Sequence, residues 1–200
     1  MAPFHYLISV WIKFFFLFTP FFALSMFLTM TRGRTDPERR RLAWRVTAAT
    51  GLLCLILFFF GNAIFALFGI TLDAFRVGAG ALLFISAVGL AGVAQPPAAP
   101  QEHEDIVVVP LAMPVIIGPA TIGTLLVLGV EASGWTHKLL GCIALLLAVA
   151  SVGAILLLGS AIERLLGRRG IHILSKITGL ILAALAAQMI LAGIRGSATP

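Results

Sequence analysis

The hydrophobic positions of this chain form six long runs that are separated by short polar segments. Each run is too long, and too uniformly apolar, for a membrane β-strand of about 10 alternating residues. About 20 apolar residues in a helix cross a hydrocarbon core roughly 30 Å thick. The pattern therefore predicts an all-α membrane protein with six transmembrane helices, over about 14–30, 46–68, 77–93, 106–130, 139–162 and 177–194.

A polar linker divides the chain near its middle. Residues 95–105 are rich in proline and then acidic, a composition that cannot bury a core. We therefore expect a first three-helix repeat over 1–94, a cytoplasmic linker over 95–105 and a second three-helix repeat over 106–200.

Similarities between the two halves favour an internal duplication. Pro20 and Pro119 lie 99 positions apart, while Gly78 and Gly179 lie 101 apart, as do Gly69 and Gly170. Because each half holds an odd number of spans, related halves must sit in the membrane in opposite orientations, as in many secondary transporters. The alternative is a plain six-helix bundle in which the prolines match by chance.

Basic residues indicate the orientation of the spans. Ten Lys and Arg side chains fall in the first and fifth loops, against four on the other side, and the cytoplasmic side carries the excess. The distribution predicts that both termini are periplasmic and that the linker is cytoplasmic.

The first and fourth predicted spans contain helix breakers. Span 4 holds Pro110, Pro114 and Pro119, with Gly118 beside the last, and span 1 holds Thr19-Pro20. Each interior proline removes one N–H donor and crowds the carbonyl four residues earlier. In lipid, such irregular backbone survives only when it is buried in protein or lines a wet cavity. We therefore expect helices 1 and 4 to be broken at these Pro and Gly residues, with the breaks facing inward.

Broken helices provide a binding site without charged side chains. The free N–H groups of a half-helix suit a carboxylate, and the freed carbonyls suit an ammonium or a cation. Thr121 has two readings, since its hydroxyl can contact a ligand or bond a freed carbonyl. The predicted substrate-binding residues are Thr19, Pro20, Phe21, Pro114, Gly118, Pro119, Ala120, Thr121 and Gln188.

Composition and spacing argue against several other classes of protein. Hydrophobic residues make up 60% of the chain and charged residues 11%, and the net charge of +6 comes from basic loops without the interleaved aromatic residues of a nucleic-acid site. No Asp, Glu or His falls inside the predicted spans, and Cys54 and Cys142 are far apart. The sequence therefore predicts neither an enzyme nor a catalytic dyad, a metal site or a cofactor.

Several motifs resemble those of the MarC family. They are VPLAMP at 109–114, GPATI at 118–122, FRVG at 75–78, GLILAA at 179–184, QMIL at 188–191 and ERRRLA at 38–43. The resemblance extends from about residue 19 to residue 194, and it implies a six-span bacterial inner-membrane protein related to neutral amino acid transporters. Members of the family usually have Asn-Pro where this chain has Thr19-Pro20, a difference that bears on the identity of the substrate.

Together these features predict a secondary transporter for a small polar solute, such as glycine or alanine, that works by alternating access. Coupling to a sodium ion and uncoupled facilitation are both compatible with the sequence. The alternatives are an exporter of amino acids or toxic metabolites and a non-transporting scaffold or accessory protein. The expected partners are the solute, the lipid bilayer and a second copy in a homo-oligomer, without nucleic acid.

Overall fold

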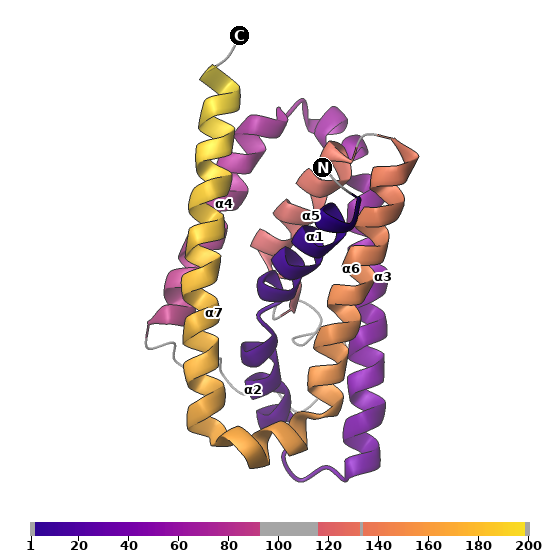
Figure 1. Cartoon of the computed structure of the whole chain (residues 1–200), viewed down its shortest axis with the longest axis vertical. Helices are drawn as coiled ribbons and strands as arrows, with labels where there is room; N and C mark the ends of the chain where they lie inside the picture. Colours follow the sequence, from indigo (N-terminus) through magenta and orange to yellow (C-terminus); the bar gives the residue numbers. More distant parts are fainter. Residues whose placement is uncertain (1–2, 93–115, 133, 199–200) are drawn as a thin grey trace.

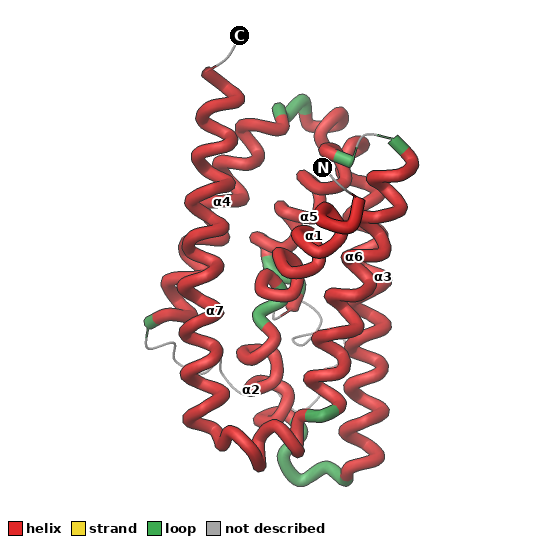
Figure 2. The backbone as a smooth tube through the Cα atoms, in the orientation of Figure 1, coloured by secondary structure: helices red, strands yellow, loops and turns green. Residues whose placement is uncertain are grey.

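Helices account for most of the chain that the structure describes. The computed structural model describes residues 3–92, 116–132 and 134–198. The described ranges consist of helices and short loops and contain no strand, which confirms the all-α prediction (Figure 2). The helices are α1 (Pro3–Leu17), α2 (Pro20–Met30), α3 (Asp36–Phe68), α4 (Leu72–Ala91), α5 (Pro119–Glu131), α6 (Trp135–Leu157) and α7 (Gly159–Ala198).

Helix α3 begins ten residues before its hydrophobic run because its polar first turn is capped. The backbone N–H and the hydroxyl of Thr35 both donate to the Glu38 carboxylate at 2.8 Å, and Pro37 lies within the first turn. This capping box satisfies amides that would otherwise lack partners. Hydropathy alone underestimates the helix, since its first turn is helical without being apolar.

Helix α4 also begins earlier than its hydrophobic run, so that two charged residues expected before it belong to the helix. The Thr71 hydroxyl caps the helix by accepting from the Ala74 N–H at 3.3 Å. The α3–α4 connection is therefore short, and Asp73 and Arg76 lie on helix α4.

Helix α7 is bent where the sequence predicts the fifth loop. Gly167 has φ 63° and ψ 171° inside an otherwise helical stretch. Positive φ is the region that glycine adopts readily. Figure 1 shows the segment before this bend lying across the base of the molecule, and the long segment after it running the full height of the bundle.

Four described helices are long and apolar enough to cross a membrane. They are the 36–60 part of α3 together with α4, α6 and α7. Helices α1 and α2 form a fifth candidate span that is bent by 40° between Leu17 and Pro20, where the sequence predicts a break. The predicted fourth span is described only from Ile116 onward, so Pro114 and the linker 95–105 lie outside the described residues. The count of six spans therefore stays a prediction.

The chain ends and the basic loops lie at opposite ends of the bundle (Figure 1). Helix α1 begins and α7 ends at one end, together with the α3–α4 and α5–α6 turns; we call this the termini end. The arginine-rich α2–α3 loop and the α6–α7 turn lie at the other end, which we call the arginine end. This arrangement agrees with the sidedness assumed in counting the loop charges.

Helices α4 and α7 are antiparallel and approach closely along a row of small residues. A Cβ atom on Gly179 would lie 2.8 Å from the Ala91 nitrogen and 2.9 Å from the Ala87 oxygen, and one on Gly80 would lie 3.1 Å from the Ala186 oxygen. Small residues let membrane helices approach until their backbones touch. This pair makes the most extensive helix contact among the described residues.

The surroundings of Gly80 and Gly179 match at a constant sequence interval. Gly80 faces the Ala186 oxygen and the Ile190 nitrogen, while Gly179 faces the Ala87 oxygen and the Ala91 nitrogen. Adding 99 to 80, 87 and 91 gives 179, 186 and 190, and 99 is also the interval between the two prolines of the breaks. The glycine pairs that are 101 apart do not share an environment, since a Cβ on Gly78 would meet nothing within 4 Å.

We predict that Gly179→Ala loosens the α4–α7 contact. The new methyl group would press on backbone atoms of α4, which cannot rotate away, and overpacking of this kind typically lowers stability by about 1–3 kcal/mol. Thermal unfolding of the purified protein in detergent measures the effect. The matched control is Gly78→Ala, which adds a methyl group in open space and should leave the midpoint unchanged or higher.

Candidate functional site

The break between α1 and α2 is built on a left-handed residue followed by proline. Thr19 has φ 47° and ψ 58°, and Pro20 is the first residue of α2, where its missing N–H is not needed. The Thr19 N–H donates to the Phe16 carbonyl, and the Thr19 carbonyl accepts from the Ala23 N–H, both at 2.9 Å. The helix therefore bends at this point while these polar groups remain paired.

Thr19 is strained in this position. It has the only positive φ of any non-glycine residue that the structure describes, and the left-handed region costs a typical L-residue about 1–2 kcal/mol. Its side chain is 8% exposed and makes no capping hydrogen bond. Asparagine tolerates this conformation better than threonine does, which gives a backbone reason for the Asn-Pro that the resemblance implies at this place.

The second break has the same proline placement but a different backbone. Gly118 is extended, with φ −80° and ψ 173°, and Pro119 begins α5. The buried Thr121 hydroxyl donates to the Ile116 carbonyl at 3.4 Å. The sequence left two roles open for Thr121, a contact to a ligand or a hydrogen bond to a freed carbonyl. In the structure its hydroxyl bonds a carbonyl of the break.

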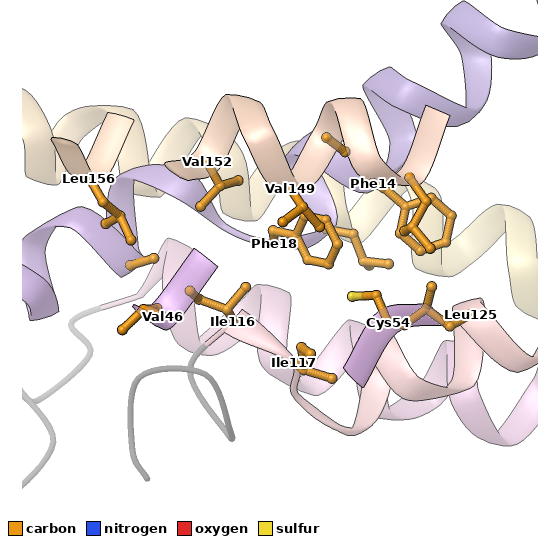
Figure 3. Packing of buried hydrophobic residues seen from close by; sticks show 14 of the residues in the cluster. Phe14, Phe18, Val46, Cys54, Ile116, Ile117, Leu125, Val149, Val152 and Leu156 are labelled. Atoms are coloured by element: carbon orange, nitrogen blue, oxygen red, sulfur yellow. The ribbon is translucent and has the colours of Figure 1, made fainter. Parts of the chain in front are cut away.

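The two breaks share one buried core. Phe18, just before the first break, and Ile116 and Ile117, just before the second, are at most 2% exposed and belong to the same cluster. Figure 3 shows Phe18, Ile116 and Ile117 among the side chains of this cluster, together with Val46 and Cys54 of α3.

One polar group of this core lacks a partner. Thr50 is 2% exposed, and its hydroxyl makes no hydrogen bond with any described residue. Because residues four apart share a helix face, Thr50 lies on the face that Val46 and Cys54 present to the core. A buried hydroxyl without a partner loses about 1–3 kcal/mol of hydration. The Thr50 hydroxyl is therefore a candidate ligand group, and no sequence pattern singles it out.

A cavity of about 230 Å³ lies between α1, α4, α5 and α7. Its apolar wall comes from all four helices, and Gln188 of the predicted site is part of its lining. The Thr124 hydroxyl lies 3.9 Å from the Met189 sulfur across the cavity wall. The polar and charged residues that line it are Lys13, Arg76, Thr124, Glu131 and Gln188.

A second hollow, of about 610 Å³, adjoins this cavity on the outer side of α1 and α7. Lys13, Leu185 and Gln188 line both of them. The remaining lining is mostly apolar and includes Ile12 and Phe16. The cavity therefore shares part of its wall with a mostly apolar hollow, in addition to having a charged end.

Ion pairs join two helices at the end of the cavity nearest the termini end. The Arg76 guanidinium contacts the Asp73 carboxylate at 2.6 Å through Nη1 and the Glu131 carboxylate through Nη2. Asp73 and Arg76 lie on α4, whereas Glu131 is the last residue of α5. The i, i+3 spacing of the first pair is visible in the sequence, but the contact across 55 residues is not.

The predicted site residues thus fall into two groups. Thr19, Pro20 and Thr121 are buried at the breaks and Phe21 is half-buried beside them, while Gln188 lines the cavity. Gly118, Pro119 and Ala120 form the start of α5, and Pro114 lies outside the described residues. Sequence reasoning missed Thr50, Asp73, Arg76 and Glu131. Within the described ranges, no three His, Cys, Asp or Glu side chains are placed to hold a metal ion.

Comparison with known proteins identifies the family. The profile described as MarC family integral membrane protein matches residues 4–198. The chain belongs to the MarC family. It is therefore an integral multi-pass membrane protein, and the resemblance drawn from its proline and glycine motifs is confirmed. No solved structure matches it significantly.

Relatives occur in bacteria and archaea. The chain is 34% identical over 199 residues to the UPF0056 membrane protein MJ1677 of Methanocaldococcus jannaschii, covering 96% of this chain and 97% of that one. It is 31% identical over 206 residues to the UPF0056 membrane protein YvbG of Bacillus subtilis, covering 96% of each. It is 33% identical over 176 residues to the UPF0056 inner membrane protein YhgN of Escherichia coli, covering 86% and 87%.

We predict that Thr19→Asn and Thr19→Gly stabilise this MarC protein by about 1 kcal/mol, because both residues adopt the left-handed conformation at lower cost. Thermal unfolding in detergent tests both variants. Thr29→Gly, in the regular part of α2, is the control and should lower stability by a few tenths of a kcal/mol, roughly the difference in helix propensity. A loss of stability in both Thr19 variants would show that the side chain makes a contact that outweighs the strain.

Proposed function

We propose that this protein is a secondary transporter, rather than an enzyme, that moves a small neutral amino acid such as glycine or alanine across the membrane by alternating access. The observation that carries the proposal is the pair of helices that begin on a proline inside the bundle, α2 at Pro20 and α5 at Pro119. Discontinuous helices of this kind form the substrate sites of many secondary transporters. A protein with only a structural role has no need for two of them.

The proposed architecture is six spans in two inverted repeats, 1–94 and 106–200, joined by the linker 95–105. The matched surroundings of Gly80 and Gly179 support it, because antiparallel helices related at one interval imply a two-fold axis across the bundle. One pair of helix contacts is balanced in the same way, since α2 packs on α7 as α5 packs on α4. The proposed orientation has both termini on the periplasmic side of an inner membrane, following the positive-inside rule.

The proposed substrate site lies at the two breaks. The first amides of α2 and α5 have no acceptor within their own helices and lie at the positive ends of the helix dipoles, where a carboxylate is favoured. The unpartnered Thr50 hydroxyl offers a further hydrogen bond. Gln188 and Thr124 line the cavity through which a solute would approach from the termini end.

Uptake of radiolabelled glycine and alanine into proteoliposomes tests the function. We expect uptake above that of protein-free liposomes, and a dependence on an imposed sodium gradient would identify the coupling ion. Gln188→Leu should reduce the flux about tenfold if its amide contacts the charged solute, whereas Ser86→Ala, on the exposed side of α4, should leave the flux unchanged. Efflux from loaded vesicles without uptake would favour an exporter, and absence of flux in both directions would favour a scaffold or accessory protein.

Thr50→Val separates a ligand contact from a structural role. Because the hydroxyl has no partner among the described residues, replacing it with a methyl group should leave thermal stability unchanged or higher. If the hydroxyl bonds the solute, the same variant should lower the flux several-fold. Unchanged stability with unchanged flux would remove Thr50 from the site. The control is Thr47→Val, which removes a hydroxyl that donates to the Ala43 carbonyl at 2.8 Å.

A further inference from the structure

At the charged end of the cavity, one guanidinium contacts two carboxylates at the same time. Arg76 contacts Asp73 through one terminal nitrogen and Glu131 through the other. The Arg76 side chain is 21% exposed, so a solute that fills the cavity can reach it, and Glu131 is the more exposed of its two partners at 42%. The two ion pairs have different structural settings.

Asp73 is a fixed partner. It lies three residues before Arg76 on the same helix and in the first turn of α4, where the helix dipole favours a negative charge. Its carbonyl and carboxylate lie against Gly193 and Gly196 of α7, so closely that a Cβ on either glycine would overlap them. This contact holds Asp73 and, through it, one edge of the Arg76 guanidinium.

Glu131 is an exchangeable partner. It is the last residue of α5, where the negative end of the helix dipole disfavours a carboxylate. The ion pair with Arg76 therefore compensates for an unfavourable position. Because α5 is anchored where Gly129 packs on the Phe58 backbone, rotation of the Glu131 side chain is the movement that would release the Nη2 side of Arg76, while Asp73 keeps its contact with Nη1.

The lining of the cavity selects the chemistry of the group that could replace Glu131. Lys13 and Arg76 are both cationic and line the same space. When Glu131 leaves, Lys13 and the Nη2 side of Arg76 face the cavity, and a carboxylate can accept charge-assisted hydrogen bonds from the Arg76 donors that Asp73 does not occupy. The neighbouring Leu83, Val127 and Leu128 provide an apolar wall for the remainder of a small molecule.

We propose that the carboxylate of the transported solute displaces Glu131 from Arg76, so that this ion pair is both the entry site for a small carboxylate and the closure of the cavity at the termini end. The part of this inference that concerns transport rests on the proposed function. The exchange of one carboxylate for another on Arg76 is independent of that function. The solute enters when Glu131 rotates away, and Glu131 closes the cavity again when the solute moves toward the breaks.

Thiol labelling tests the closure without any assumption about the solute. In a protein that carries Cys54→Ala, Cys142→Ala and Thr124→Cys, the introduced thiol lines the cavity, and a charged maleimide reports its access to water. Adding Glu131→Gln should speed labelling about tenfold, since a neutral amide loses the charge-assisted bond that keeps the cavity closed. Glu163→Gln is the matched control, because it breaks the ion pair with Arg168 at the arginine end and should leave the labelling rate unchanged.

Protection from labelling tests the recognition of a carboxylate. In the Glu131→Gln background, glycine and propionate should slow the reaction, whereas glycinamide, which lacks the carboxylate, should not. Adding Arg76→Lys should weaken this protection and Arg76→Gln should abolish it, with gel filtration used to verify that each variant is folded. Equal protection by glycine and glycinamide, or a labelling rate that does not respond to Glu131→Gln, would overturn the proposal.

The two proposals can fail separately. Protection by propionate and glycine, without uptake of glycine or alanine, would retain Arg76 as a carboxylate site and reject the proposed substrates. Uptake of both amino acids, with no difference between glycine and glycinamide in the labelling assay, would retain transport and reject the exchange at Arg76.

Discussion

Pairing of backbone polar groups away from water is the constraint on which the rest of this structure depends. In a bilayer, an N–H or carbonyl without a partner costs several kcal/mol, so a helix can be interrupted only where protein groups replace the lost bonds. At the first break the bonds on either side of Thr19 do this, and at the second the Thr121 hydroxyl does so for the Ile116 carbonyl. The breaks are therefore buried in the common core that joins α1, α3 and α5.

The close contact of α4 and α7 follows from a related requirement. Hydrocarbon is as apolar as leucine, so burial of apolar surface contributes little to helix association in a membrane, and close packing has to supply it. Gly80 and Gly179 allow that contact, and Gly193 and Gly196 extend it to the Asp73 backbone and carboxylate. The same contact sets the position of Arg76 at the end of the cavity. Packing of small residues and placement of charge are thus coupled along one pair of helices.

The interior of the bundle combines an apolar core with a partly polar cavity. The core around the breaks includes Phe14, Phe18, Ile116 and Leu125, and the Thr50 hydroxyl within it has no partner among the residues that the structure describes. The cavity lies nearer the termini end and carries charged side chains from three helices. In the proposed cycle the solute passes from the charged cavity to the backbone groups of the breaks, exchanging contacts with side chains for contacts with helix ends.

The sequence by itself determined the membrane class, the helical fold, the family and the break at Thr19-Pro20, because hydropathy and proline chemistry act locally along the chain. It misplaced the starts of α3 and α4, since capped polar turns are helical without being apolar. Only the tertiary structure decided that Arg76 meets Glu131, that Thr50 has no hydrogen-bond partner among the described residues, and that Gly80 and Gly179 have matching surroundings. Those facts depend on which helix faces pack together, and the turn-by-turn periodicity of a uniformly apolar helix does not specify which face is inward.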